Sequence, residues 1–339
     1  MQRKLIFFLA ILTILLSCSK VSIKNFPTFP EKKLDSSVLK NRIICLDPGH
    51  GATAGTDTFR AGISGEREEW INLGVSLILK DMLEQAGAKV IITRTEDVDV
   101  DLAYRANKAI ENYAEIFISI HHNGTPDRDV DYPLVFFHRK ASENPASIDF
   151  AKILQRNFKK RLNFAHMMKG FSLDDAGLYS DQLIYKTGFA VIRKTYPYMP
   201  GVIGESAFFS NPTQEKYLKE KKYNELEAQA YFDSLVEYFS KGIPYAELVS
   251  PEKNSEVQNK ISTILLRLWD GFGEHYFDLD SFIVKVNSEN VKYTYDPLSG
   301  NLLLNFDEPL KAGEYTVFVI ARNLKGNAIH PRELKFKVL

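Results

Sequence analysis

The chain has 339 residues, enough for two packed domains once a targeting segment is set aside. Its 43 acidic and 43 basic side chains balance. A nucleic-acid partner usually leaves an excess of positive charge in the sequence, so we expect no nucleic acid to bind.

The first residues carry the pattern of an export signal. Arg3 and Lys4 precede a predominantly apolar run over residues 5–16, which is short for a membrane span. The run ends in Leu-Leu-Ser-Cys, which resembles a bacterial lipobox. This resemblance implies a lipoprotein signal peptide over residues 1–18 and a lipid anchor on Cys18. An ordinary cleaved signal, in which Cys18 has no role, is the alternative. Either way we expect the protein to leave the cytoplasm, and with the lipid anchor we expect it in the cell envelope, attached to a membrane.

Residues 19–40 are polar and include Pro27 and Pro30, which predicts an extended tether without a core of its own. The second of the two cysteines, Cys45, lies inside an apolar run. We therefore expect no disulfide, and we interpret Cys45 as a small buried hydrophobe rather than a metal ligand.

Between residues 41 and 245, apolar runs of strand length alternate with helical patterns, which is typical of an α/β domain whose sheet is covered by helices. The predicted strands cover residues 43–46, 89–93, 116–120, 134–138, 189–193 and 202–205. One predicted helix begins near Glu68, and three further helices are predicted over residues 102–112, 147–162 and 213–239.

The helical pattern ends after residue 245. The polar residues 246–260 predict a linker. Residues 261–339 contain short β-rich runs separated by turn signals, which favours a small antiparallel β-sandwich. Within it, residues 321–327 resemble the corresponding part of bacterial immunoglobulin-like domains.

Four side chains that can bind a metal or move a proton stand at strand ends or at a helix start. His50 and His121 follow two predicted strands, Glu205 closes a third, and Glu68 opens a helix. Open α/β sheets gather such residues at the carboxyl edge of their strands. A catalytic zinc takes about three protein ligands and keeps one position open for water. We therefore predict His50, Glu68 and His121 as zinc ligands and Glu205 as the general base.

A family resemblance rests on a longer series of motifs. The series is Asp47-Pro48-Gly49-His50-Gly51, Glu68 with Asn72, Thr93-Arg94, Leu102 with Arg105 and Asn107, Ser119-Ile120-His121, and residues 204–211. It resembles the zinc-dependent N-acetylmuramoyl-L-alanine amidases of the type 3 family. The resemblance implies a six-stranded sheet, zinc on His50, Glu68 and His121, and a catalytic Glu205. It also implies cleavage of the amide between N-acetylmuramic acid and L-alanine in peptidoglycan, for cell-wall remodelling or daughter-cell separation.

The chain departs from the family pattern at three places. Ala52 replaces a glycine, His122 replaces a small residue, and residues 124–188 match only loosely. Strand alternation turns His122 away from His121, so we expect it to support the site rather than bind the metal. Asp47 either accepts a hydrogen bond from a ligand imidazole or caps a turn.

Several other residues have two interpretations. Glu66 and Glu69 flank Glu68, but the spacing to Asn72 in the family motif favours Glu68. We expect Arg94 and Arg105 to hold loops or helix ends by ion pairs. Arg193, at the end of a predicted strand, binds a stem-peptide carboxylate or forms a structural salt bridge.

Two other functions compete with the amidase. One is a non-catalytic envelope lipoprotein that binds peptidoglycan through a degenerate amidase fold. The other is a different zinc peptidase or a deacetylase. The expected partners are peptidoglycan, a membrane reached through the lipid anchor, and an activator protein.

Overall fold

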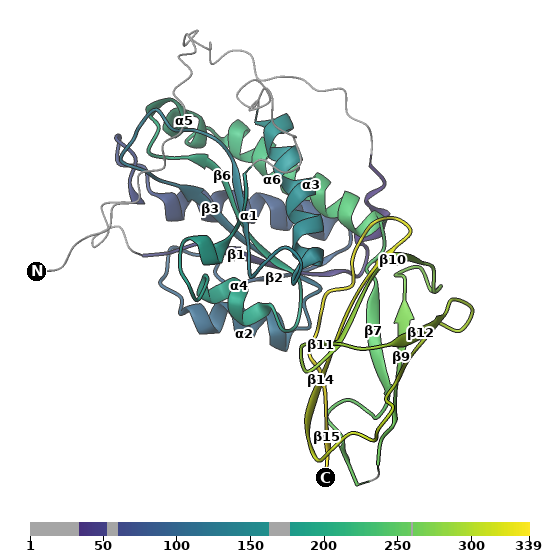
Figure 1. Ribbon diagram of the computed structural model, residues 1–339. Coiled ribbons are helices and arrows are strands. Elements are labelled where there is room, and N and C mark those ends of the chain that lie inside the picture. The colour runs from purple at the N-terminus through teal and green to yellow at the C-terminus, as the bar shows by residue number, and fades with distance from the viewer. Residues whose placement is uncertain (1–33, 53–59, 163–176, 259) are drawn as a thin grey trace, which may run out of the picture. The chain divides into compact units, whose positions relative to one another are not determined.

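The computed structural model describes residues 34–52, 60–162, 177–258 and 260–339 (Figure 1). The predicted signal peptide with Cys18 and most of the predicted tether lie outside these residues. Among the residues described, no helix combines the length and the apolar character that crossing a membrane requires.

The predicted α/β domain is built on a six-stranded sheet, as expected. Its strands are β1 (Ile43–Pro48), β2 (Lys89–Ile92), β3 (Ile116–Asn123), β4 (Leu134–Phe137), β5 (Leu178–Ser180) and β6 (Gly201–Phe208). They run in the order β2-β1-β3-β6-β4-β5. Strands β2, β1, β3 and β6 are parallel, whereas β4 is antiparallel to β6. The carboxyl ends of β1, β3 and β6 therefore meet at one edge.

Helices cover both faces of this sheet. They are α1 (Glu68–Gln85), α2 (Leu102–Glu111), α3 (Pro145–Arg161), α4 (Ala190–Thr195), α5 (Pro212–Leu218) and α6 (Lys221–Ser240). Helices α1, α3 and α6 pack together on one face, and α2 and α4 pack together on the other (Figure 1). Because both faces are covered, β1 and β3 are buried along almost their whole length.

Two elements differ from their predictions. The expected strand at residues 189–193 is wrong: these residues enter helix α4, and β5 is the sixth strand instead. Val191 and Ile192 are buried, and a short apolar run does not distinguish a strand from a buried helix. The helix expected at residues 213–239 is two helices, because α5 ends at Leu218 and α6 begins at Lys221.

The tether prediction is wrong for its last residues. Ser36–Leu39 form a short 3-10 helix that packs against α6, and Leu39 is fully buried. The chain therefore joins the folded domain before residue 40. Cys45 behaves as predicted: it is a free, fully buried thiol, and burial raises its pKa.

The C-terminal part contains two sheets, as expected for a β-sandwich. One has the order β11-β10-β14-β15-β8 and the other has the order β12-β13-β9-β7. The strands are β7 (Tyr245–Ser250), β8 (Glu256–Val257), β9 (Thr263–Trp269), β10 (Phe277–Val286), β11 (Glu289–Asn290), β12 (Tyr293–Asp296), β13 (Asn301–Asn305), β14 (Gly313–Asn323) and β15 (Leu334–Val338). Pairing is antiparallel except between β8 and β15. One apolar core includes Leu266, Leu302, Val317 and Phe336.

The predicted linker at residues 246–260 is wrong. Its residues include most of β7 and all of β8, which are strands of the two sheets. In β7 only Leu248 is buried, so the strand shows little of the apolar alternation that identifies a strand in a sequence. The sandwich therefore begins directly after α6.

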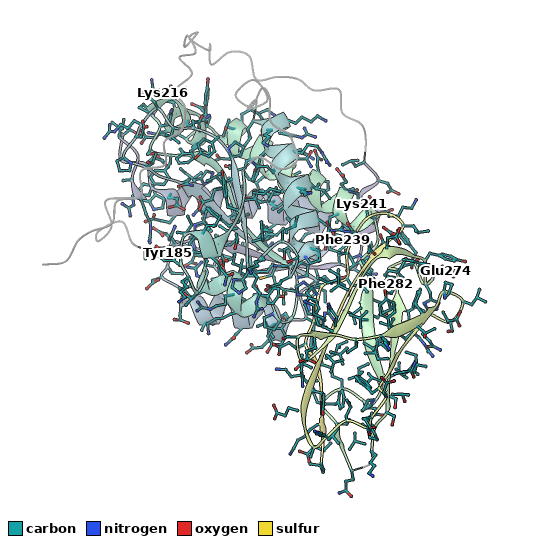
Figure 2. All side chains as sticks on the ribbon, in the orientation of Figure 1. Tyr185, Lys216, Phe239, Lys241, Glu274 and Phe282 are labelled. Carbon is teal, nitrogen blue, oxygen red and sulfur yellow. The ribbon has the colours of Figure 1, made fainter. Side chains whose placement is uncertain are left out.

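Two asparagines of the sandwich cap the end of α6. Asn323 donates from Nδ2 to the Lys241 carbonyl at 2.7 Å, and Asn327 donates from Nδ2 to the Tyr238 carbonyl at 2.9 Å. Phe239 and Lys241 are labelled at this end of the helix in Figure 2. The last carbonyls of a helix have no partner within the helix, and here side-chain amides supply donors.

The segment between β3 and β4 is fastened by a buried carboxyl group. Asp131 accepts hydrogen bonds from Gln214 Nε2 at 2.5 Å and from the Phe208 amide at 3.3 Å. Burial raises the pKa of Asp131 to about 7, although both hydrogen bonds act in the opposite direction. The folded chain therefore holds this proton more tightly than the unfolded chain, in which the ordinary value is 3.8.

This linkage predicts that stability falls as the pH rises from about 4 to about 7, by on the order of 2–4 kcal/mol in the free energy of unfolding. Asp131→Asn should flatten that slope, because the amide does not ionise. Urea unfolding at several pH values measures it, with the exposed Asp129→Asn as the matched control. Equal slopes in Asp131→Asn and the unaltered protein would contradict the assignment.

Candidate metal and catalytic site

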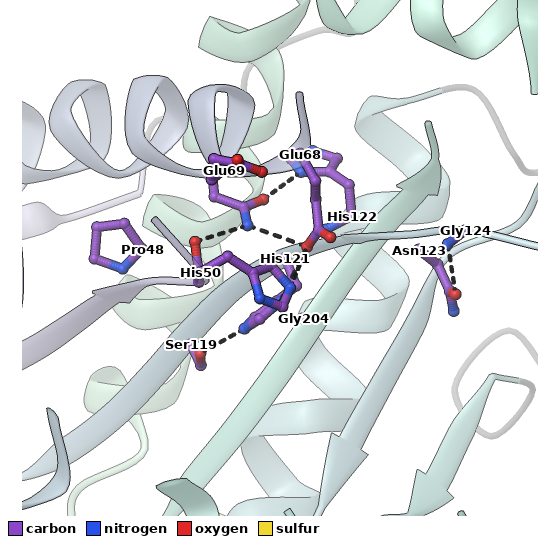
Figure 3. A network of polar contacts seen from close by, with 12 residues as sticks. Pro48, His50, Glu68, Glu69, Ser119, His121, His122, Asn123, Gly124 and Gly204 are labelled. Atoms are coloured by element: carbon purple, nitrogen blue, oxygen red, sulfur yellow. Dashed lines mark hydrogen bonds and ion pairs between the residues drawn. The ribbon is translucent and has the colours of Figure 1, made fainter. Parts of the chain in front are cut away.

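The three predicted ligands come together at the carboxyl edge of the sheet (Figure 3). His50 Nε2, Glu68 Oε1 and His121 Nδ1 lie 3.1 Å from one another in all three pairs. Four-coordinate zinc with bonds of about 2.0–2.1 Å spaces its ligand atoms about 3.3–3.4 Å apart. Two imidazole nitrogens and a carboxylate oxygen at this spacing fit a zinc ion.

The turn that carries His50 needs its glycines. His50 has a positive φ of 58°, and a Cβ on Gly49 would lie 2.2 Å from the His121 ring. Gly51 has a φ of 137°, and a Cβ there would lie 2.1 Å from the Val98 carbonyl oxygen. Any larger residue at position 49 would therefore displace a predicted ligand.

Two buried arginines hold the same turn by its carbonyl groups. Arg94 donates to the carbonyls of Pro48 and Gly49 at 2.9 and 2.8 Å. Arg105 donates to the carbonyls of Pro48 and His50 at 2.7 and 2.6 Å. The expectation that these arginines hold loops is confirmed, although most of the bonds go to the backbone rather than to acidic side chains.

His121 is oriented through a serine. Ser119 Oγ lies 2.7 Å from Asp47 Oδ2 and 3.1 Å from His121 Nε2. Burial alone would raise the pKa of Asp47, but Arg105, Thr93 and Ser119 hold it below its usual value. An ionised Asp47 only accepts hydrogen bonds, so the serine hydroxyl donates to it and accepts from the imidazole N–H. This leaves the lone pair of His121 Nδ1 toward the cluster.

This arrangement settles the two interpretations of Asp47. The carboxylate does support the imidazole of a predicted ligand, but it acts through Ser119 and not by direct contact. It also accepts hydrogen bonds from Thr93 Oγ1 at 2.6 Å and from Arg105 Nη1 at 2.8 Å. The sequence contained the Ser-Ile-His motif, but not the register that places Ser119 opposite Asp47 in neighbouring strands.

The Glu68 carboxylate is buried but stays charged. Burial opposes its charge, but the neighbouring imidazoles of His121 and His50 hold the pKa of Glu68 well below its usual value. Its Oε1 also lies 3.1 Å from Nδ2 of Asn72, one helical turn further along α1. The helix therefore supplies both a predicted ligand and a residue that fixes it.

Glu205 stands beside this cluster on β6, opposite His121 of β3 in the strand register. Its Oε2 is buried and has no hydrogen-bond partner within the described parts of the chain. Burial, followed by the charges of Glu68 and Glu227, raises the pKa of Glu205 well above its ordinary value. A carboxylate whose pKa is raised in this way accepts a proton more readily than an ordinary one.

The other candidates lie elsewhere. Glu69 pairs with Arg67 at 3.1 Å, and Glu66 lies 4.0 Å from Lys219, so neither joins the cluster. Arg193 lies on α4 instead of a strand, and it donates to the carbonyls of residues 187 and 188. The prediction that it ends a strand at the cleft edge is wrong.

His122 faces away from the cluster, as strand alternation predicted. Its ring is buried between Asn72 of helix α1 and Glu227 of helix α6. Sequence reasoning missed Glu227 altogether, because a single glutamate in a helix with many polar residues carries no signal of burial.

Comparison with known proteins identifies the family. The family model described as N-acetylmuramoyl-L-alanine amidase matches residues 44–237, which is more than half of the chain. The chain belongs to this amidase family. The predicted α/β fold and the predicted class of enzyme, an N-acetylmuramoyl-L-alanine amidase, are thereby confirmed.

Two relatives agree with this membership, and one solved structure shares the fold. The chain is 29% identical over 223 residues to the germination-specific N-acetylmuramoyl-L-alanine amidase of Bacillus subtilis (strain 168), covering 61% of this chain and 84% of that protein. It is 26% identical over 231 residues to the amidase AmiC of Escherichia coli O6:H1, covering 60% of this chain but 54% of that protein. The crystal structure of an N-acetylmuramoyl-L-alanine amidase from Clostridium difficile 630 shares the fold, with a TM-score of 0.50 and 22% identity over 59% of this chain and 98% of that chain.

The arginine contacts predict a strong effect of Arg105→Lys. A lysine cannot reach Asp47 and the backbone carbonyls together, so buried acceptors lose their donors, at about 2–4 kcal/mol in the free energy of unfolding. Urea unfolding measures the loss, with the half-exposed Arg139→Lys as the control. A loss below about 0.5 kcal/mol at Arg105 would contradict the assigned role.

Proposed function

We propose that this protein is a zinc-dependent amidase that cleaves the bond between N-acetylmuramic acid and L-alanine in peptidoglycan. The observation that carries the proposal is the spacing of His50 Nε2, Glu68 Oε1 and His121 Nδ1. The family match supports the reaction, and the names of the relatives support the substrate.

His50, Glu68 and His121 would hold the zinc ion. When bound there, zinc would polarise the amide carbonyl and make a water molecule acidic near neutral pH. The partly exposed side chains of His50 and His121, at 22% and 16%, would leave the ion accessible to substrate.

Glu205 would carry the proton transfers. Its unpartnered Oε2 would accept a proton from the attacking water and return it to the departing nitrogen of L-alanine. The raised pKa of Glu205 favours the first of these steps, because it makes the carboxylate a better proton acceptor. The reaction needs no covalent intermediate with the protein.

The proposal extends to the whole chain. Residues 1–18 would be a lipoprotein signal, Cys18 the lipid anchor, and the following residues a tether to the envelope membrane. The amidase domain would then act on peptidoglycan within reach of that membrane, in cell-wall remodelling or daughter-cell separation. The immunoglobulin-like character of the β-sandwich and an activator protein stay predictions.

Glu205→Gln should lower the cleavage of purified peptidoglycan by at least about 100-fold, because the amide cannot accept the proton. Mass analysis of the released peptides measures the cleavage, and zinc content should stay near one ion per chain. A chelator should abolish cleavage by the unaltered protein. Glu111→Gln, at an exposed position, is the control.

The products separate the competing functions. An amidase releases stem peptides that begin with a free L-alanine amino group. Released single amino acids or acetate would indicate a different zinc hydrolase. Binding to peptidoglycan without any release would indicate a non-catalytic protein, and full activity of Glu205→Gln would remove Glu205 from the reaction.

A further inference from the structure

A second set of buried polar side chains connects helix α6 with the ligand cluster. His122 Nε2 lies 2.9 Å from Glu227 Oε2, and His122 Nδ1 lies 2.8 Å from Asn72 Oδ1. His122, Glu227 and Asn72 are almost fully buried, at 1%, 0% and 0% exposure. They come from β3, α6 and α1, so the contacts join three elements.

The orientation of the Asn72 amide is fixed by its surroundings. Its Nδ2 lies 3.1 Å from Glu68 Oε1 and 3.2 Å from the Gly49 carbonyl oxygen, and both of these atoms are acceptors. Its Oδ1 faces His122, so His122 Nδ1 carries the hydrogen. A flipped amide would bring its oxygen against these two acceptors.

We propose that His122 and Glu227 are positioning residues for the zinc site. Glu227 fixes the imidazole of His122, His122 fixes the amide of Asn72, and Asn72 holds two parts of the site together. These two parts are the Glu68 carboxylate and the turn that carries His50. This inference rests on the proposed zinc site.

The burial of Glu227 supports this role. A carboxylate that is buried without water is costly unless it is paired, and packing alone would be served equally well by apolar side chains. One oxygen of Glu227 pairs with His122, while the other has no hydrogen-bond partner in the described residues. The buried hydrogen bonds of Glu227, His122 and Asn72 therefore lead to the predicted ligand Glu68 and not to the surface.

The same domain supplies a matched control. His138 Nδ1 lies 3.0 Å from Asp181 Oδ2, and the two side chains are 5% and 0% exposed. His138 follows β4 and Asp181 follows β5, and these two parallel strands run opposite to β6, so the pair lies away from the edge that carries the predicted ligands. Asp181 accepts its other hydrogen bond from the Phe189 amide, and the pair contacts none of the three ligands through a hydrogen bond among the described residues.

The test is the zinc affinity of the metal-free full-length protein, measured by competition with a chromophoric chelator. His122→Phe should weaken zinc binding about 10–100-fold, the usual effect of losing a group that orients a ligand. His138→Phe should leave the affinity within about threefold of the unaltered protein, even where it lowers the melting temperature. The melting temperature of each metal-free variant reports folding separately.

Two variants at Glu227 test the other end of the chain of contacts. Glu227→Gln should keep the affinity within about threefold, because the amide can donate to His122 Nε2 and leave the Nδ1 hydrogen toward Asn72. Glu227→Leu should weaken binding about tenfold or more, because nothing then fixes the ring. This variant keeps the test decisive where His122→Phe does not fold.

The outcomes are distinguishable. Unchanged affinity in both His122→Phe and Glu227→Leu would overturn the inference and leave the proposed function intact. An equal loss in His138→Phe would also overturn it, since the loss would then come from general destabilisation. Failure of the unaltered protein to bind zinc would overturn the cofactor proposal and this inference together.

Discussion

The site depends on one electrostatic constraint: three atoms that carry lone pairs must be held close to one another. His50 Nε2, Glu68 Oε1 and His121 Nδ1 lie 3.1 Å apart, and one of them belongs to a carboxylate. Two imidazole lone pairs and a negative charge repel at this distance unless a proton or a cation lies among them. We therefore interpret the surrounding network as the structure that holds this cluster in place.

Each predicted ligand is held by a different set of buried groups. Arg94 and Arg105 hold the turn of His50 by its carbonyls, Ser119 and Asp47 orient His121, and Asn72 holds Glu68. Buried polar groups stabilise a fold only when their partners are present. The many partners explain how an edge of the sheet rich in charged side chains remains folded, while His50 and His121 stay partly exposed.

Much of this could be predicted from the sequence, because metal ligands at strand ends leave a local signal. His50, Glu68, His121 and Glu205 each follow or close an apolar run or open a helix, and their convergence follows from the parallel order of the strands. Groups that act across the fold leave no such signal. Glu227 is 105 positions from His122 along the chain. Ser119 is 72 positions from Asp47, so the sequence did not show that it links Asp47 to His121 either. Residues 189–193 were predicted as a strand and residues 246–250 as part of a linker. Both predictions failed because such short segments contain too few residues to show a helical or a strand periodicity.

The most direct test of the account is anomalous X-ray scattering at the zinc edge from crystals of the zinc-loaded protein. The account predicts one strong peak about 2.0–2.2 Å from His50 Nε2, Glu68 Oε1 and His121 Nδ1, with Glu205 beside it and His122 outside its coordination. A peak bonded to His122 or Glu205 in place of one of these three atoms, or the lack of a peak at this edge of the sheet, would contradict the account.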